Sequence, residues 1–355
     1  MSKKNILLTG TAGFIGSNFV PYFIDKYPEY NLINLDLLTY AGNLDNLKEC
    51  EGNPRYKFIK GDICNRELVE FIFTEYDIQG VVHFAAESHV DNSIKNPGVF
   101  IETNVNGTFT LIDVAQKYWM QKPFTYKENY KGCRFHHIST DEVYGTLNET
   151  DLFTEETPYA PNSPYSASKA SSDMIVRSYQ ETYGMNTVIT NCSNNYGPKQ
   201  HNEKLIPTII RKALAGESIP IYGDGKNIRD WLYVLDHCKG IDLVYHSGKE
   251  ANVYNIGGRN ERSNLQIVDT ICTILDSKVP KTNSYKELIT FVEDRAGHDR
   301  RYAIDATKLE RELGWKADED FESGIVITVE WYLNLFQVSD TNKLENTSIE
   351  RCHLS

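Results

Sequence analysis

The sequence predicts an α/β fold, with a doubly wound parallel sheet followed by a smaller α/β region that covers a ligand. Three observations lead to this prediction. Short apolar runs alternate with amphipathic stretches through the first half of the chain. A glycine-rich turn, Gly10–Gly16, follows the first apolar run directly. Beyond Asn194, glycine and proline break the chain into short segments. A chain of 355 residues is long enough to build both parts.

The first half supplies the parallel strands and the helices between them. We expect strands at Asn5–Thr9, Asn31–Asp36, Tyr56–Lys60, Gly80–Ala85 and Phe135–Ser139. A helix from about Tyr165 to Tyr183 leads into a further strand, Asn186–Asn191, which continues the alternation. Pro21 stands seven residues into the first expected helix, where it normally costs about 3 kcal/mol. That helix is therefore expected to bend or to end early.

The domain boundaries follow from the change in pattern near Asn194, where alternating strands and helices give way to short segments. Residues 1–190 are expected to form a Rossmann-type NAD-binding domain, with a return segment near 233–256. We expect residues 191–336 to form mainly a substrate-binding domain. Residues 337–355 are polar and lack apolar periodicity, so we expect a flexible tail.

Composition excludes several classes of protein. The net charge of -12 argues against a nucleic-acid surface, because phosphate binding needs a basic face. The seven cysteines are scattered without a Cys-x-x-Cys pair, so neither a disulfide framework nor a zinc site is indicated. His136 and His137 are adjacent in an expected strand and point to opposite faces, so no metal is predicted. No apolar run is long enough to span a bilayer, and we expect a cytoplasmic protein with no membrane partner.

The turn after the first strand has the spacing of a dinucleotide site. Gly10, Gly13 and Gly16 let the backbone approach a pyrophosphate at the helix N-terminus. Asp36 closes the second strand about twenty residues later, where a carboxylate accepts from ribose hydroxyls and repels the extra phosphate of NADP. We therefore predict NAD, with Asp62-Ile63 beside the adenine. The alternative is an ordinary turn and a solvated Asp36.

Tyr165 and Lys169 are four residues apart on an expected helix, so both side chains lie on one face. A neighbouring ammonium group and NAD+ favour the phenolate, which makes Tyr165 a candidate base for a sugar hydroxyl. The alternative is a surface Tyr/Lys pair. Ser139-Thr140, after an apolar strand, offers a hydroxyl to the same proton network.

Two acids adjoin that hydroxyl. Asp141 and Glu142 stand just past a strand's carboxyl end, where doubly wound folds bind ligands. A plain dehydrogenase does not need them, whereas elimination of water needs one group to take a proton from carbon and another to protonate the leaving hydroxyl. The alternative is a solvated acidic turn.

The glycine spacing, Asp62, His83-Phe84-Ala85-Ala86 and Tyr165-x-x-x-Lys169 together resemble the extended short-chain dehydrogenase/reductase family over roughly Lys4 to Phe336. The resemblance implies further contacts with the dinucleotide from residues after each strand. They are Phe14, Ile15, Leu37, Leu38, Thr39, Ala85, Ala86, Glu87, Ser88, Thr103 and Asn195, with Tyr165 and Lys169 also touching the cofactor.

A narrower resemblance rests on Ser139–Gly145 and on five further stretches. They are Thr39–Asn43, Ala85–Asp91, Asn194–Pro198, Glu203–Pro207 and His298–Tyr302. These stretches resemble the dTDP-glucose 4,6-dehydratases. The resemblance implies a set of residues that hold the nucleotide sugar. They are Ser88, Thr140, Asn194, Lys204, Leu205, Pro220, Ile221, Tyr222, Arg229, Asn264, Arg295 and His298.

Arg229 and Arg295 suit a diphosphate, because a guanidinium forms paired hydrogen bonds with its oxygens. Their alternative role is a surface ion pair with Asp230 or Asp294. Two positions depart from the family: Asn92 stands where it usually has Arg, and Ala296 where it usually has Pro.

The resemblance implies an activity, which we take as a hypothesis. Tyr165 removes the proton of the sugar 4-hydroxyl as carbon 4 is oxidised by NAD+. Glu142 then takes the carbon-5 proton, Asp141 protonates the leaving 6-hydroxyl, Thr140 supports Tyr165, and reduction at carbon 6 restores the cofactor. It also implies a homodimer and a role in making deoxysugar precursors, often rhamnose. The alternatives are a UDP-sugar 4,6-dehydratase, a nucleotide-sugar epimerase or decarboxylase on the same scaffold, and a non-catalytic NAD-binding protein.

Overall fold

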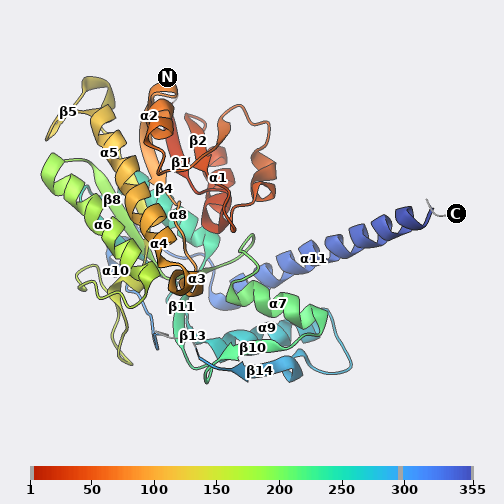
Figure 1. Ribbon diagram of the computed structural model, residues 1–355. Helices are drawn as coiled ribbons and strands as arrows, with labels where there is room; N and C mark the ends of the chain where they lie inside the picture. The colour runs from red at the N-terminus through yellow and green to blue at the C-terminus, as the bar shows by residue number, and fades with distance from the viewer. Residues whose placement is uncertain (1–3, 295–298, 353–355) are drawn as a thin grey trace.

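The computed structural model describes residues 4–294 and 299–352 and has a seven-stranded parallel sheet at its centre (Figure 1). The strand order is β12-β8-β7-β4-β1-β2-β3. The strands are β1 (Lys4–Thr9), β2 (Tyr30–Asp36), β3 (Tyr56–Lys60), β4 (Ile78–His83), β7 (Phe135–Thr140), β8 (Thr187–Cys192) and β12 (Asn252–Ile256). The order reverses between β1 and β4, and such a reversal opens a crevice at the strands' carboxyl ends. The predicted fold class is confirmed.

Strand β4 differs from its expected range, because it ends at His83 and not at Ala85. The backbone N–H of Phe84 still bonds to the carbonyl of Thr9 at 3.1 Å, but that of Ala85 bonds to the Thr9 side chain at 3.2 Å. The chain therefore turns away from the sheet at Ala85, into the crevice.

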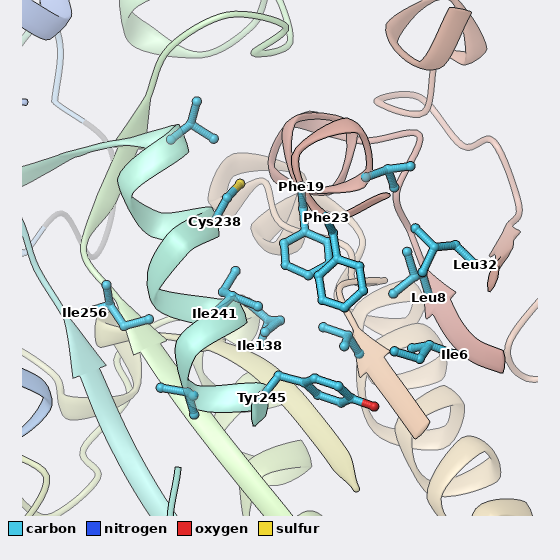
Figure 2. Packing of buried hydrophobic residues seen from close by; sticks show 14 of the residues in the cluster. Ile6, Leu8, Phe19, Phe23, Leu32, Ile138, Cys238, Ile241, Tyr245 and Ile256 are labelled. Carbon is cyan, nitrogen blue, oxygen red and sulfur yellow. The ribbon is translucent and has the colours of Figure 1, made fainter. Parts of the chain in front are cut away.

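Helices cover both faces of the sheet. One face carries α1 (Phe14–Lys26), α8 (Val234–Ser247) and α10 (Thr307–Leu313), and the other carries α2 (Arg66–Glu75), α5 (Thr108–Trp119) and α6 (Pro164–Tyr183). Each face buries its own apolar cluster against the strands. Figure 2 shows part of the first cluster, where Phe19 and Phe23 of α1 meet Ile241 and Tyr245 of α8.

Helix α1 continues past Pro21 to Lys26, so the expectation that it ends early is wrong. The residues after the proline, Phe23 and Ile24, are fully buried in the first cluster. Their packing stabilises the last turn and outweighs the missing hydrogen bond, because burial of one such side chain contributes about 1.5–3 kcal/mol.

The smaller region holds two short sheets. One contains β9 (Asn194–Tyr196), β11 (Ile228–Tyr233) and β13 (Glu261–Ser263), and the other pairs β10 (Ile219–Tyr222) with β14 (Ile289–Val292). A third apolar cluster joins them to α7 (Leu205–Ala215), α9 (Asn264–Lys278) and the start of α11 (Phe321–Cys352). Because α8 and β12 follow β11 along the chain, the smaller region leaves the main sheet after β8 and returns to it at β12.

The remaining elements are short. They are β5 (Met120–Lys122), β6 (Thr125–Tyr126), α3 (Val90–Lys95), α4 (Pro97–Phe100), the π-helical turn η2 (Ile101–Gly107) and the 3-10 turns η1 (Leu44–Cys50), η3 (Glu128–Tyr130), η4 (Asp141–Tyr144) and η5 (Tyr285–Leu288). Helix α11 extends away from the other elements in Figure 1 and includes most of the segment predicted to be a polar tail. Among the described residues, no helix combines the length and the apolar character needed to cross a membrane.

Candidate active site

A pocket of about 310 Å³ lies over the carboxyl ends of the central strands. Its wall begins at the glycine turn after β1, passes Asp36 at the end of β2, and reaches Thr140 at the end of β7. Tyr165 and Lys169 of α6 line the other end. The structure therefore brings the predicted cofactor turn and the predicted catalytic residues into one cavity.

The glycine turn leaves room for a pyrophosphate. Gly10 has a φ of +71°, and a Cβ atom there would lie 2.5 Å from the Cα of Ala85. A Cβ on Gly16 would lie 2.4 Å from the Cα of Thr11. Helix α1 starts after Gly13, which makes no side-chain cap, so the first backbone N–H groups of the helix are available to a ligand. These features fit the diphosphate of a dinucleotide.

Asp36 is buried at the end of β2, so the alternative of a solvated carboxylate is wrong. Its two oxygens accept hydrogen bonds from the backbone N–H groups of Ala12, at 2.9 Å, and Leu38, at 2.8 Å. Burial raises the pKa of Asp36, and these two hydrogen bonds oppose the rise. The carboxylate is therefore fixed in orientation at the place where a ribose would lie.

Most other residues predicted to hold the cofactor line this pocket. They are Phe14, Ile15, Leu37, Thr39, Asp62, Ile63, Ala85, Ala86, Glu87, Ser88, Thr103 and Asn195. Leu38 is not in the pocket wall, and it contributes its backbone N–H to Asp36.

Tyr165 and Lys169 are both buried, with exposed fractions of 8% and 4%, so the alternative of a surface Tyr/Lys pair is wrong. Lys169 Nζ donates to the backbone carbonyl of Ile138 at 2.7 Å. Burial raises the pKa of Tyr165 well above its ordinary value, the charge of Glu142 raises it further, and a hydrogen bond with Thr140 opposes both. The phenol is therefore the stable form of the Tyr165 side chain in these surroundings.

The triplet at the end of β7 is held in a 3-10 turn. Thr140 Oγ1 caps this turn by accepting from the backbone N–H of Glu142 at 3.3 Å, and it lies 3.4 Å from Oδ1 of Asp141. Asp141 is 1% exposed, which excludes a solvated acidic turn. Its Oδ2 is buried and has no hydrogen-bond partner among the residues that the structure describes.

The two acids differ in their surroundings. Burial raises the pKa of Asp141 well above its ordinary value, the charges of Glu142 and Asp230 raise it further, and Arg229 opposes them. Glu142 is only partly buried and lines the pocket. Two carboxyl groups in unlike environments can divide the roles of acid and base.

The residues predicted to hold the nucleotide sugar fall into three groups. Ser88, Thr140, Asn194 and Lys204 line the pocket, and Lys204 Nζ donates to the backbone carbonyl of Ser88 at 3.1 Å. Leu205 (start of α7), Pro220, Ile221 and Tyr222 (β10), Arg229 (β11) and Asn264 (start of α9) lie in the smaller region, outside the pocket wall. Arg295 and His298, and the departure at Ala296, lie outside the described residues.

Arg229 is buried, so the alternative of a surface ion pair with Asp230 is wrong. Its guanidinium donates to the backbone carbonyls of Ile228, at 2.7 Å, and Asp299, at 2.9 Å, and it stacks on the ring of Tyr302 at 4.3 Å. The Asp230 carboxylate accepts instead from backbone N–H groups at Gly258 and Asn260. The charge of Arg229, in the smaller region, lowers the pKa of Asp141 at the end of the pocket near β7.

Several residues of the site carry no signal that sequence reasoning used. Cys192, Ser193, Gln200 and His201 also line the pocket. His237 of α8 fixes the Asn195 side chain through Nδ1, 3.0 Å from Oδ1. One missed residue had a readable signal: Asp173 follows Lys169 by four residues, the spacing that also pairs Tyr165 with Lys169. Asn92, which departs from the family, lies in α3 and not in the pocket wall.

Known proteins resemble this chain over most of its length. The sequence model of the family described as GDP-mannose 4,6 dehydratase matches residues 7–328. A dTDP-glucose 4,6-dehydratase of Salmonella typhimurium is 56% identical over 337 residues, which cover 92% of each chain. Another of Escherichia coli strain K12, dTDP-glucose 4,6-dehydratase 1, is 53% identical and covers 93% of this chain and 92% of its own.

Solved structures agree with the sequence relatives. The dTDP-glucose 4,6-dehydratase of Bacillus anthracis, in complex with NAD, has a TM-score of 0.82 and 49% identity, covering 93% of this chain and 97% of its own. DesIV of Streptomyces venezuelae, a dTDP-glucose 4,6-dehydratase with NAD and TYD bound, has a TM-score of 0.84 and 44% identity, covering 93% and 97%. A UDP-glucose 4-epimerase of Thermotoga maritima has a TM-score of 0.81 but 28% identity, covering 94% and 99%. The chain therefore belongs to the dTDP-glucose 4,6-dehydratase family.

Proposed function

We propose that the protein is a hydro-lyase that converts dTDP-glucose to dTDP-4-keto-6-deoxyglucose with NAD as a resident cofactor. The observation that carries the proposal is the pair of carboxyl groups, the buried Asp141 and the partly buried Glu142, in the same pocket as Tyr165 and Lys169. Oxidation alone needs Tyr165 and Lys169, whereas loss of water also needs an acid and a base. Relatives and solved structures that bear this enzyme's name support the proposal.

The glycine turn, the open N-terminus of α1 and Asp36 would hold NAD, whose diphosphate and ribose match their hydrogen-bonding groups. When bound, NAD supplies the redox chemistry, by oxidising carbon 4 of the sugar and later reducing carbon 6. The fixed carboxylate of Asp36 disfavours NADP, because its charge would face the additional phosphate.

Tyr165 is the base for the sugar 4-hydroxyl in this proposal. Its pKa is raised in the pocket by burial, so the phenol needs a nearby positive charge before it can give up its proton. Lys169 supplies that charge, and NAD+ would add to it when bound. Thr140, whose side chain opposes the rise in the pKa of Tyr165, can share the proton.

Asp141 is the acid and Glu142 is the base for the elimination. Because burial raises the pKa of Asp141 well above its ordinary value, burial favours the protonated carboxyl group, which can donate to the departing 6-hydroxyl. Glu142, which is more accessible, takes the proton from carbon 5, whose acidity is increased by the ketone at carbon 4. Thr140 Oγ1 lies 3.4 Å from Oδ1 of Asp141 and accepts from the backbone N–H of Glu142, so it fixes the turn that carries both acids.

The smaller region would bind the nucleotide part of the substrate. Arg229, whose orientation is fixed by two carbonyls and the Tyr302 ring, is a candidate for the diphosphate. The residues on β10 and at the start of α9 would contact the base, and Arg295 and His298 remain part of the same proposal. A homodimer and a cytoplasmic location also belong to it, and light scattering after size-exclusion chromatography tests the first.

The decisive experiment is incubation of the purified protein with dTDP-glucose in heavy water, followed by NMR of the product. We expect a 4-keto-6-deoxy sugar that carries solvent deuterium at carbon 5 and the original carbon-4 hydrogen at carbon 6. A 4-epimer without loss of water would establish the epimerase alternative, and no turnover with tight cofactor binding would establish the non-catalytic one. Parallel incubation with UDP-glucose tests the base preference, for which a single methyl contact supplies only about 1–3 kcal/mol.

A further inference from the structure

The carboxyl group of Asp173 lies near Lys169 on α6, but outside the wall of the pocket that Tyr165 and Lys169 line. It is completely buried, one helical turn after Lys169 on the same face of α6. Ser139 Oγ donates to its Oδ2 at 2.8 Å, and the Tyr159 hydroxyl donates to the same oxygen at 3.0 Å. Side chains from β7 and from the segment before α6 thus converge on one buried carboxylate.

The ammonium group of Lys169 needs such a partner. Burial lowers the pKa of Lys169, because taking a charge out of water is costly unless an opposite charge is near. The carbonyl of Ile138 gives Lys169 a hydrogen bond, but it carries no net charge. The negative charge of Asp173 raises the pKa of Lys169, and Lys169 in turn lowers that of Asp173.

Other titratable groups packed around Asp173 do not replace Lys169 as its cation. His137 of β7 places Nε2 3.2 Å from Oδ1, and His83 of β4 packs on His137 with ring centroids 5.2 Å apart. Burial lowers the pKa of both histidines well below the ordinary value, so both are neutral at neutral pH.

The other groups near Asp173 are phenols, a thiol and one exposed ion pair. Tyr144 and Tyr159 have raised pKa values because they are buried, and Cys192, which faces Lys169, is likewise a neutral thiol. Arg177 and Glu181 line a small pocket of about 110 Å³ that Asp173 also reaches, and they lie 3.5 Å from each other. The charge of Asp173 is therefore balanced mainly by Lys169.

We propose that Asp173 is a positioning residue for the reaction: it keeps Lys169 positively charged near Tyr165 and so sets the pH range in which Tyr165 loses its proton. The inference rests on the proposed function, because it takes Tyr165 as the base. Asp173 touches neither cofactor nor substrate in this proposal and acts through Lys169 alone.

Asp173 and Lys169 are both charged only between two limits of pH. Burial raises the pKa of Asp173 to about 6, with Lys169, Ser139 and Tyr159 opposing the rise. Below that value Asp173 gains a proton and Lys169 loses its counter-charge. On the alkaline side, Lys169 itself loses its proton, and Asp173 moves that limit to higher pH.

The test is the pH profile of kcat for Asp173→Asn, which removes the charge and keeps the shape of the side chain. We expect the alkaline limb of the kcat profile to shift to lower pH by about one pH unit or more. At pH 8, kcat should fall about tenfold, with KM little changed. Asp242→Asn is the matched control, because Asp242 is also buried and pairs with Lys26 at 2.7 Å, away from the pocket. It should lower stability and leave both limbs in place. Unmoved limbs in Asp173→Asn, with activity lowered equally at every pH, would overturn the proposal.

A measurement that does not depend on turnover separates this inference from the proposed function. The ε-carbon resonance of Lys169 in protein labelled with ¹³C-lysine, assigned by its loss in Lys169→Met, reports its titration directly. Asp173→Asn should lower the titration midpoint by about one pH unit or more, and an unchanged midpoint contradicts the proposal even if the wild-type protein turns over dTDP-glucose. If the wild type shows no turnover, the proposed function fails while this measurement still decides the role of Asp173.

A second variant covers the case in which Asp173→Asn does not fold. Tyr159→Phe removes one hydrogen bond to the carboxylate and leaves its charge, so the pKa of Asp173 rises. The acid limb of the kcat profile should therefore move to higher pH, while the alkaline limb stays. An acid limb that does not move counts against Asp173 as the group that controls Lys169.

Discussion

The ammonium group of Lys199 lies 3.2 Å from the backbone carbonyl oxygen of Ser17. That carbonyl would normally accept from the N–H four residues later, but residue 21 is a proline and has no N–H. Lys199 stands in the loop after β9, next to the pocket residue Gln200, so a side chain from the smaller region supplies the hydrogen bond that α1 lacks at Pro21. The same ammonium group also pairs with Glu49 at 2.6 Å.

Lys199→Met should therefore lower the free energy of unfolding by about 1–2 kcal/mol, because it leaves the Ser17 carbonyl unsatisfied. Urea unfolding measures the change. In a Pro21→Ala background the new N–H can bond to Ser17, so the same substitution should cost clearly less. Glu49→Gln, which removes only the exposed ion pair, should cost about 0.5 kcal/mol. An equal cost of Lys199→Met in both backgrounds would show that its bond to Ser17 contributes nothing.

Glu142→Gln and Asp141→Asn should separate the two halves of the proposed elimination. Without Glu142, removal of the carbon-5 proton loses its base, and we expect dehydration to fall about 10²–10⁴-fold, the usual contribution of one such group. Asp141→Asn should lower dehydration by a similar factor, because the leaving hydroxyl loses its proton donor. In both variants oxidation at carbon 4 remains possible, so the reduced cofactor should accumulate after substrate is added. Its absorbance should rise accordingly. Tyr165→Phe is the contrast, since it should block that absorbance change as well.

The parts of this site that could be predicted from the sequence are those set by residues close together in the chain. The turn at Gly10–Gly16 and the spacing of Tyr165 and Lys169 are set by a few consecutive residues, and the structure places them in one pocket. The course of α1 through Pro21 could not be predicted, because it depends on burial of Phe23 and on Lys199, which is distant in sequence. The environment of Asp173 is likewise formed by three separate segments, although its spacing from Lys169 was visible.

Asp36→Asn should weaken NAD binding by about 1.5–3 kcal/mol, because ribose hydroxyls lose a charged acceptor while the neutral amide keeps the shape of the site. Binding of NADP should change less, so the preference between the two cofactors should narrow. Fluorescence titration of the cofactor-free protein with each dinucleotide measures both effects. Asp45→Asn, in the turn η1 and outside the pocket wall, is a suitable control and should alter neither affinity. An undiminished preference for NAD in Asp36→Asn would assign the discrimination to another residue.

His237 should make the stability of the protein depend on pH in acid. Burial lowers the pKa of His237 to about 3, from an ordinary value near 6.5. Between these two values the unfolded chain binds a proton that the folded protein excludes, so stability falls as pH falls. This one histidine accounts for about 1.4 kcal/mol per pH unit across that window. His237→Gln should remove that share of the slope and keep a group able to donate to Asn195, 3.0 Å away in the wild type. Urea unfolding of both proteins at pH 7.5, 6 and 5 measures the slopes, and parallel curves would mean that His237 is protonated in the folded protein.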